Sequence, residues 1–204
     1  MGLNYGTIRN CHSTCSVSGE NNVGGLTATN SGGTITNCYS TGNISGNGNV
    51  GGLVGWNDDA GMIKNCYSVG GVSGSVCVGG LVGCHDDGTI RNCYSTGSVL
   101  GSNYVGGLTG LVNNYTYVSA SFWDIETSDR KSSAGGVGKT TAEMKTMSTF
   151  TEAGWDFIEI WGIGENQTYP YLLTGPAGDF NYDKKVDLFD LAILASHWLE
   201  ATTP

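Results

Sequence analysis

The chain has 204 residues, 34 of them glycine, and a formal net charge of −9. This glycine content excludes a helical bundle, because each glycine inside a helix costs about 1 kcal/mol relative to alanine. The acidic charge argues against nucleic acid as a partner, and no apolar run reaches the ~18 residues of a membrane span.

Residues 1–114 repeat with a period of 27 or 28 residues. The block Gly-Thr-Ile-Arg-Asn-Cys-His-Ser starts at Gly6, and related blocks start at Gly33, Gly61 and Gly88. A second block, Val-Gly-Gly-Leu, keeps the same step and starts at Val23, Val50, Val78 and Val105. Self-similarity at this period is typical of solenoids and propellers.

Each unit holds three short apolar runs punctuated by Gly, Asn and Ser, which indicates strands separated by corners. A propeller blade needs ~40 residues and four strands, more than one unit supplies. The repeat therefore predicts a mainly β fold, a right-handed parallel β-helix with three short strands per coil. The hand follows from the strong right-handed preference of parallel crossovers.

Residues one period apart are expected to lie above one another, about 4.8 Å apart. The predicted interior columns are Ile8, Ile35, Ile63 and Ile90, and Leu26, Leu53, Leu81 and Leu108. The predicted corner column is Asn10, Asn37, Asn65 and Asn92, because asparagine tolerates the left-handed conformation. Paired glycines such as Gly51-Gly52 are expected at a bend that no side chain fits. The predicted outer columns are the solvated face Arg9, Thr36, Lys64 and Arg91, and an aromatic ladder of His12, Tyr39, Tyr67 and Tyr94, for which stacking is favoured over ligand binding.

Four of the seven cysteines share one predicted column, namely Cys11, Cys38, Cys66 and Cys93. Neighbouring Cα atoms in such a column lie about 4.8 Å apart, which is within the range of a disulfide, so disulfide bonds remain an alternative. Buried free thiols are the preferred interpretation, because a bridge would twist an in-register ladder and cysteine packs well as a small apolar group.

Two pairs of aspartates occupy equivalent positions in neighbouring coils, so they are expected to form an acidic cluster of Asp58, Asp59, Asp86 and Asp87. Solvated turns are the favoured interpretation, since Asp is common at turns. Two alternatives stay open: a second calcium site, and paired carboxylates of a sugar-cleaving β-helix with Trp56 as a sugar platform and His85 as a proton carrier.

The recurring Val-Gly-Gly-Leu-Val-Gly and Gly-Thr-Ile-x-Asn-Cys-Tyr-Ser blocks of residues 1–114 resemble the GLUG-motif repeats of bacterial surface proteins and filamentous-haemagglutinin-type adhesins. Residues 115–176 are similar to the closing segment that follows such repeats. This segment is richer in Trp and Phe, and it is expected to cover the exposed end of the column. Its glycine run Gly135–Lys139 lacks a preceding hydrophobic strand, so a loop is preferred to a phosphate-binding site.

Residues 177–204 carry an EF-hand-like pattern, with oxygen side chains at loop positions 1, 3, 5, 9 and 12. The predicted Ca²⁺ ligands are Asp179, Asn181, Asp183, the Lys185 carbonyl, Asp187 and Asp190. Lys184 stands at position 6, where these loops have glycine, and Asp190 is shorter than the usual glutamate. A helix is expected to follow from Leu188 to Leu199.

That loop and helix resemble one half of a type I dockerin, a family that anchors secreted proteins through a cohesin partner. The resemblance implies calcium binding and a cohesin-like protein or cell-surface component as partner; a calcium-stabilised terminal cap is the alternative. Together with the repeat, it predicts a non-catalytic extracellular or cell-surface protein in adhesion or scaffolding, with further coils expected before Met1. The alternatives are a carbohydrate-active β-helix, or an accessory module of a larger secreted enzyme that acts on polysaccharide.

Overall fold

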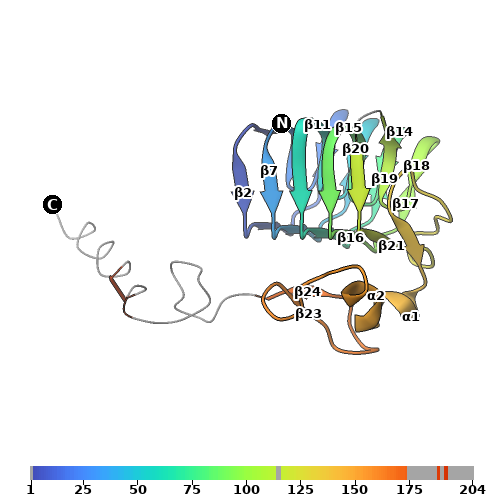
Figure 1. Cartoon of the computed structure of the whole chain (residues 1–204). Helices are drawn as coiled ribbons and strands as arrows, with labels where there is room; N and C mark the ends of the chain where they lie inside the picture. The colour runs from blue at the N-terminus through green and yellow to red at the C-terminus, as the bar shows by residue number, and fades with distance from the viewer. Residues whose placement is uncertain (1, 114–115, 174–187, 189–190, 193–204) are drawn as a thin grey trace. The chain divides into compact units, whose positions relative to one another are not determined.

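The structure is a computed structural model that describes residues 2–113, 116–173, 188 and 191–192. Residues Met1–Tyr171 form one compact unit, and Leu172–Pro204 form a second. The first unit is a β-solenoid of parallel strands, in which each coil lies beside the next (Figure 1). Within the described residues, no helix has the length and apolar character needed to cross a membrane.

The strands of the solenoid stack into four sheets. Sheet A contains β1 (Leu3–Asn4), β2 (Thr7–Arg9), β6 (Thr27–Ser31), β7 (Thr34–Thr36), β11 (Val54–Lys64), β15 (Val82–Arg91), β19 (Thr109–Val112) and β20 (Thr116–Ser119). Sheet B contains β3 (His12–Ser13), β8 (Tyr39–Ser40), β12 (Tyr67–Ser68), β16 (Tyr94–Ser95), β21 (Phe122–Asp124) and β22 (Val137–Lys139). Sheet C contains β4 (Val17–Ser18), β9 (Ile44–Ser45), β13 (Val72–Ser73) and β17 (Val99–Leu100). Sheet D contains β5 (Asn21–Gly24), β10 (Gly48–Gly51), β14 (Val76–Gly79) and β18 (Asn103–Gly106).

The coils therefore have four sides, and the expectation of three strands per coil is corrected. The first sequence block supplies two strands instead of one. Its asparagine turns the chain sharply: Asn37 has φ 53° and Asn65 has φ 52°, both in the left-handed region. The Thr-Ile half of the block consequently lies in sheet A, and the Tyr-Ser half lies in sheet B. The right-handed sense of the coil stays a prediction.

The predicted stacking of equivalent residues is confirmed by the strand register. Ile35 pairs with Ile8 and with Ile63, and Ile63 pairs with Ile90, in parallel strands. The isoleucines of the three inner coils are fully buried, as are Leu53, Leu81 and Leu108. A second apolar cluster lies between sheets C and D and contains Val23, Ile44, Val50, Val72, Val78 and Val99. The interior is thus a set of aliphatic ladders that run the length of the solenoid.

Two further predicted columns have the expected environment. Asn65 Nδ2 donates to Asn37 Oδ1 across 3.1 Å, so the corner asparagines link neighbouring coils. At the paired glycines, a Cβ on Gly51 would lie 2.6 Å from Gly83 N and 2.8 Å from Leu81 O, inside van der Waals contact. The bend therefore accepts only glycine for lack of space.

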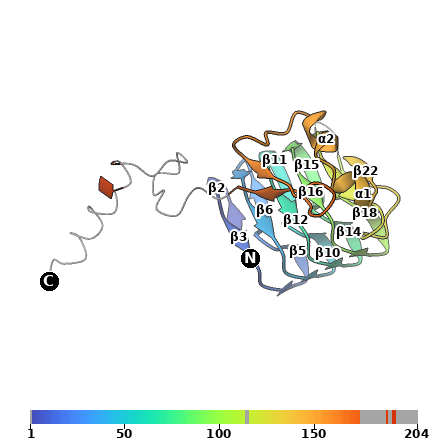
Figure 2. The same ribbon diagram turned by 90° about the horizontal axis from the view of Figure 1, so that it is seen from below.

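Residues 116–171 both extend the stack and cover one of its sides. β20 pairs with β15, β21 pairs with β16, and β22 pairs with β21, so the column continues past the last full repeat. The chain then forms α1 (Thr141–Met144), α2 (Met147–Thr151) and the paired strands β23 (Trp161–Gly162) and β24 (Tyr171–Leu172). These elements lie along the sheet B side of the solenoid in both views (Figures 1 and 2). The segment expected to close the end of the column thus covers a flank as well.

The predicted calcium ligands Asp179, Asn181, Asp183, Lys185, Asp187 and Asp190 lie outside the described residues. Of the expected C-terminal helix, the structure describes Leu188, Leu191 and Ala192, which are helical. The calcium loop and its metal therefore stay predictions.

Candidate functional site

The acidic residues predicted from the repeat lie in the middle of two neighbouring long strands of sheet A, β11 and β15. Asp58 of β11 lies in register with Asp86 of β15. The register then shifts between Asp58 and Gly61, where the chain bulges, and Asp59 has φ 49°. Asp59 accepts a hydrogen bond from Ser31 Oγ in the preceding coil at 2.7 Å. The bulge thus gathers carboxylates from two neighbouring coils.

Asp58 is a member of this acidic cluster whose pKa is shifted by its surroundings. Burial raises the pKa of its carboxyl, and the negative charges of Asp59 and Asp86 raise it further. Its Oδ1 is buried without a hydrogen-bond partner among the described residues. A carboxyl of this kind holds a proton more readily than a solvated one, which suits a general acid. Among the described residues, no three or more His, Cys, Asp or Glu side chains are grouped as a metal site.

His85 does not lie where a proton carrier for this cluster would be needed. Its side chain is fully buried, so it is inaccessible to a sugar at the surface. It belongs instead to a buried polar ladder that was not predicted: Asn4 Nδ2 donates to Asn30 Oδ1 and Asn30 Nδ2 donates to Asn57 Oδ1, both at 2.7 Å. Asn57 Nδ2 in turn lies 3.1 Å from His85 Nδ1. The near-27-residue spacing of these four positions is the signal by which the sequence could have shown the ladder.

We expect His85 to make the fold acid-sensitive, because burial lowers the pKa of its imidazole below the ordinary 6.5. Between pH 6.5 and the folded pKa, the unfolded chain binds a proton that the folded chain does not, so stability falls with falling pH by about 1.4 kcal/mol per unit. His85→Asn removes this titration and keeps an amide in the ladder. Urea unfolding across this pH range measures the difference.

The reference for this prediction is the wild-type curve, and the His85→Asn curve should be flatter than it below pH 6.5. Parallel curves for the wild type and His85→Asn would show that His85 contributes nothing to the acid sensitivity.

The predicted aromatic ladder is confirmed. The rings of His12, Tyr39, Tyr67 and Tyr94 stack in order with centroid separations of 5.0, 4.8 and 5.0 Å. The far end of the ladder is covered: Trp161 is fully buried 6.2 Å from the Tyr94 ring, and Tyr94 OH donates to Pro170 O at 2.6 Å. The preference for stacking over ligand binding agrees with this packing, because the rings stack on one another and the flanking segment packs against Tyr67 and Tyr94.

Asp124 joins the end of the stack to the flanking segment, a role that was not predicted from the sequence. Its carboxylate is fully buried and accepts four hydrogen bonds. Oδ1 accepts from the backbone N–H groups of Glu126 and Thr127, and Oδ2 accepts from Thr141 Oγ1 and Tyr169 OH. Burial alone would raise the pKa of Asp124, but these donors outweigh it and hold the pKa below its usual value.

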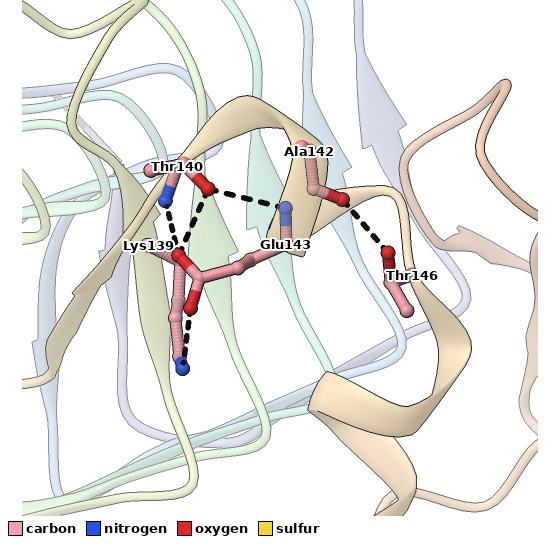
Figure 3. A network of polar contacts seen from close by, with 5 residues as sticks. All are labelled: Lys139, Thr140, Ala142, Glu143 and Thr146. Carbon is pink, nitrogen blue, oxygen red and sulfur yellow. Dashed lines mark hydrogen bonds and ion pairs between the residues drawn. The ribbon is translucent and has the colours of Figure 1, made fainter.

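The glycine run that superficially fits a phosphate-binding loop is built into the stack. Val137–Lys139 form β22, which corrects the expected loop at these residues. Thr140 then caps α1 in a capping box: Glu143 N donates to Thr140 Oγ1, and Thr140 N donates to Glu143 Oε2 (Figure 3). Lys139 forms an ion pair with Glu143 at 3.1 Å. The polar groups of this segment therefore pair with one another.

The seven cysteines are free thiols, and the inner members of the predicted column are fully buried. The Sγ atoms of Cys38, Cys66 and Cys93 each donate to the carbonyl two residues earlier at 3.1 Å. The hydrogen bond with Cys66, together with burial, raises the pKa of Cys38. The Cys38 thiol is therefore protonated and poorly nucleophilic, which agrees with a packing role.

A shallow groove of about 390 Å³ runs across the outside of sheet C. Its lining consists of serine, asparagine, glycine and aliphatic residues from successive coils: Ser16, Val17, Ser18, Asn43, Ile44, Ser45, Gly71, Val72, Ser73, Ser98 and Leu100. This lining is uncharged, so the groove offers hydroxyl and amide groups without a titratable one.

Three consecutive segments of the chain match the family model of the GLUG motif: residues 19–45, 46–73 and 74–100. Each segment is one coil that runs from a strand of sheet D, through sheets A and B, to a strand of sheet C. The resemblance drawn from the repeated blocks is confirmed for these coils.

Two known proteins are similar to parts of the chain. A protein of Evansella cellulosilytica, provisionally described as a Gly-rich membrane protein, is 41% identical over 70 residues; the match covers 32% of this chain and 8% of that protein's length. A crystal structure from Bacteroides ovatus, of a provisionally named immunoglobulin A1 protease, superposes with a TM-score of 0.69 at 24% identity, over 84% of this chain and 70% of that one. The structural likeness concerns the fold alone. What the chain shares with known proteins is therefore the GLUG repeat in its central coils and a β-solenoid fold.

Proposed function

We propose that the chain is a non-catalytic repeat module that acts in adhesion or scaffolding outside the cell or at its surface. The observation that carries the proposal is the use of the side chains: the Ile, Leu, Cys, Asn and Tyr columns serve stacking between coils. Such a column makes a rigid body with a regular outer surface, as an adhesive or spacing element requires. The description of the Evansella cellulosilytica relative as a membrane protein supports a surface location.

Surface display is tested by labelling intact cells with an antibody against the solenoid. Labelling of intact cells supports the proposal, with an antibody against a cytoplasmic protein as the control for leakage. Signal that emerges only after the cells are permeabilised would overturn it.

We propose further that the C-terminal unit binds Ca²⁺ through its dockerin-like loop and attaches the module to a cohesin-like partner. The support is the spacing of Asp179, Asn181 and Asp183 with Asp187 and Asp190, which places oxygen ligands as in an EF-hand. Calorimetric titration of the chelator-treated full chain should show one Ca²⁺ bound per chain. Asp183→Ala should abolish this binding.

The matched control for calcium binding is Asp129→Asn, an exposed acidic residue in the solenoid unit. It should bind Ca²⁺ as the wild type does. Binding that survives Asp183→Ala but is lost with Asp58→Asn would move the site to the acidic cluster of sheet A.

The raised pKa of Asp58 favours a second candidate, a carbohydrate-active β-helix in which Asp58 and Asp86 act as paired carboxylates. This activity predicts release of reducing sugar from an acidic polysaccharide and its loss in Asp58→Asn. Equal rates for the wild type and Asp58→Asn would exclude it.

A further inference from the structure

The outer face of sheet A carries two columns of side chains that alternate with the buried isoleucines. One column, which we name the cationic strip, consists of Arg9, Thr36, Lys64, Arg91 and Ser119. The neighbouring column consists of Thr7, Thr34, Met62, Thr89 and Tyr117. Their strands β2, β7, β11, β15 and β20 lie side by side in Figure 1.

The cations of the strip are exposed, and no carboxylate among the described residues forms an ion pair with them. Lys64 and Arg91 occupy paired positions of adjacent parallel strands, and like charges that face each other in this way are destabilising. The ion pair that the described residues form is Lys139–Glu143, away from the strip. In a chain with 9 Lys and Arg residues against 18 Asp and Glu residues, three exposed cations in one column make a local region of positive potential that attracts an anion.

The acidic cluster on the same strands forms no ion pair with the strip within the described residues. Asp87 precedes Arg91 by four residues, and the chain bulges between them at Gly88, where φ is 127°. Asp87 and Arg91 are both exposed, so salt with a Debye length of about 8 Å screens their attraction. The sheet face is therefore polarised, with its cationic end open to a ligand.

The groups beside the cations fit a sugar. The threonine hydroxyls of the neighbouring column can both donate and accept hydrogen bonds, as sugar hydroxyls do. Tyr117 ends this column with 65% of its surface exposed, which leaves its ring open to a sugar face. A repeat of about 4.8 Å between coils also favours an elongated, repeating ligand over a compact one.

We propose that the cationic strip binds a linear anionic polysaccharide, with its carboxylate groups against Arg9, Lys64 and Arg91 and its sugar rings along the threonine column up to Tyr117. The inference rests on the proposed non-catalytic role, and it names the class of partner. Binding is reversible and neither makes nor breaks a covalent bond.

The test is affinity electrophoresis of the full chain in gels that contain polygalacturonate, with neutral galactan as the uncharged comparison. The wild type should be retarded by polygalacturonate alone, and less so at high salt. The double variant Lys64→Gln/Arg91→Gln should bind about tenfold more weakly, because two exposed charge contacts are lost. Lys131→Gln changes the charge at an exposed site outside the strip and should bind as the wild type does.

A second readout separates binding from folding. Lys64→Gln alone should keep or raise the thermal midpoint, because it relieves the repulsion from Arg91. Equal retardation of the double variant and Lys131→Gln would overturn the proposal, as would equal retardation by galactan. Equal retardation by single-stranded DNA would show that the strip binds polyanions in general, and would overturn the proposed preference for a polysaccharide. If intact cells are labelled by the antibody but the chain does not bind polygalacturonate, the proposed surface role is supported and the proposed polysaccharide partner is excluded.

Discussion

Gly51→Ala is expected to lower the free energy of unfolding of the solenoid by about 3 kcal/mol or more. The new methyl group would overlap the carbonyl oxygen of Val54 and lie 2.6 Å from Gly83 N. Because backbone atoms surround the site, no side chain can move aside, and two neighbouring coils would have to separate. Urea unfolding followed by circular dichroism measures the loss.

The matched control is Gly6→Ala, because no atom lies within 4 Å of a Cβ added at Gly6. This substitution should leave stability unchanged or raise it by up to about 1 kcal/mol through the lower entropy of the unfolded chain. Equal stability of Gly51→Ala and Gly6→Ala would contradict the close packing of coils at the paired glycines.

Asp124→Asn is expected to destabilise the fold by about 3 kcal/mol, since hydrogen bonds to a buried charged group are stronger than neutral ones. All four donors to Asp124 aim at carboxylate oxygens. An amide NH₂ in place of either oxygen would face donors and leave them unpaired. Thermal unfolding at neutral pH measures the loss, and the exposed Asp129→Asn, which makes the same chemical change, should show almost none.

The same carboxylate gives the fold a second acid-sensitive range. Because the folded pKa of Asp124 lies below its unfolded value of about 3.9, its contribution is fully present above pH 3.9 and is lost as the pH falls through the folded pKa. Tyr169→Phe removes one of the four donors and should shift this loss to higher pH. An unchanged acid transition in Tyr169→Phe would show that the hydrogen bond from Tyr169 does not set the pKa of Asp124.

Gly51→Ala and Asp124→Asn test two different contacts within the solenoid unit. Gly51 lies where one coil contacts the next, whereas Asp124 lies where the flanking segment joins the last strands of sheet B. A binding module needs both, because the outer face of sheet A keeps its spacing only while the coils stay in register. Loss of polygalacturonate binding in Gly51→Ala at temperatures where it is unfolded would follow from this dependence.

The repeat alone determined the parallel stack and the residues that occupy its interior. A side chain at a fixed step of 27 or 28 residues has the same neighbours in every coil, so Ile35, Ile63 and Ile90 could be placed in one ladder without coordinates. The left-handed corner at Asn65 and the crowded bend at Gly51 followed from the conformational preferences of asparagine and glycine. These features are local or periodic, which is why a single sequence shows them.

Only the tertiary structure decided which side the aromatic segment covers, how many sides a coil has, and where the isolated polar residues lie. Trp161 covers the tyrosine ladder, and Tyr169 meets Asp124 across 45 residues, through contacts that no period encodes. His85 is fully buried because its strand pairs in register with β11, where His85 lies opposite the buried Asn57. The predicted role of His85 as a proton carrier at the surface was therefore wrong. A contact between two segments that do not repeat depends on how both segments pack. The sequence of either segment alone therefore does not predict it.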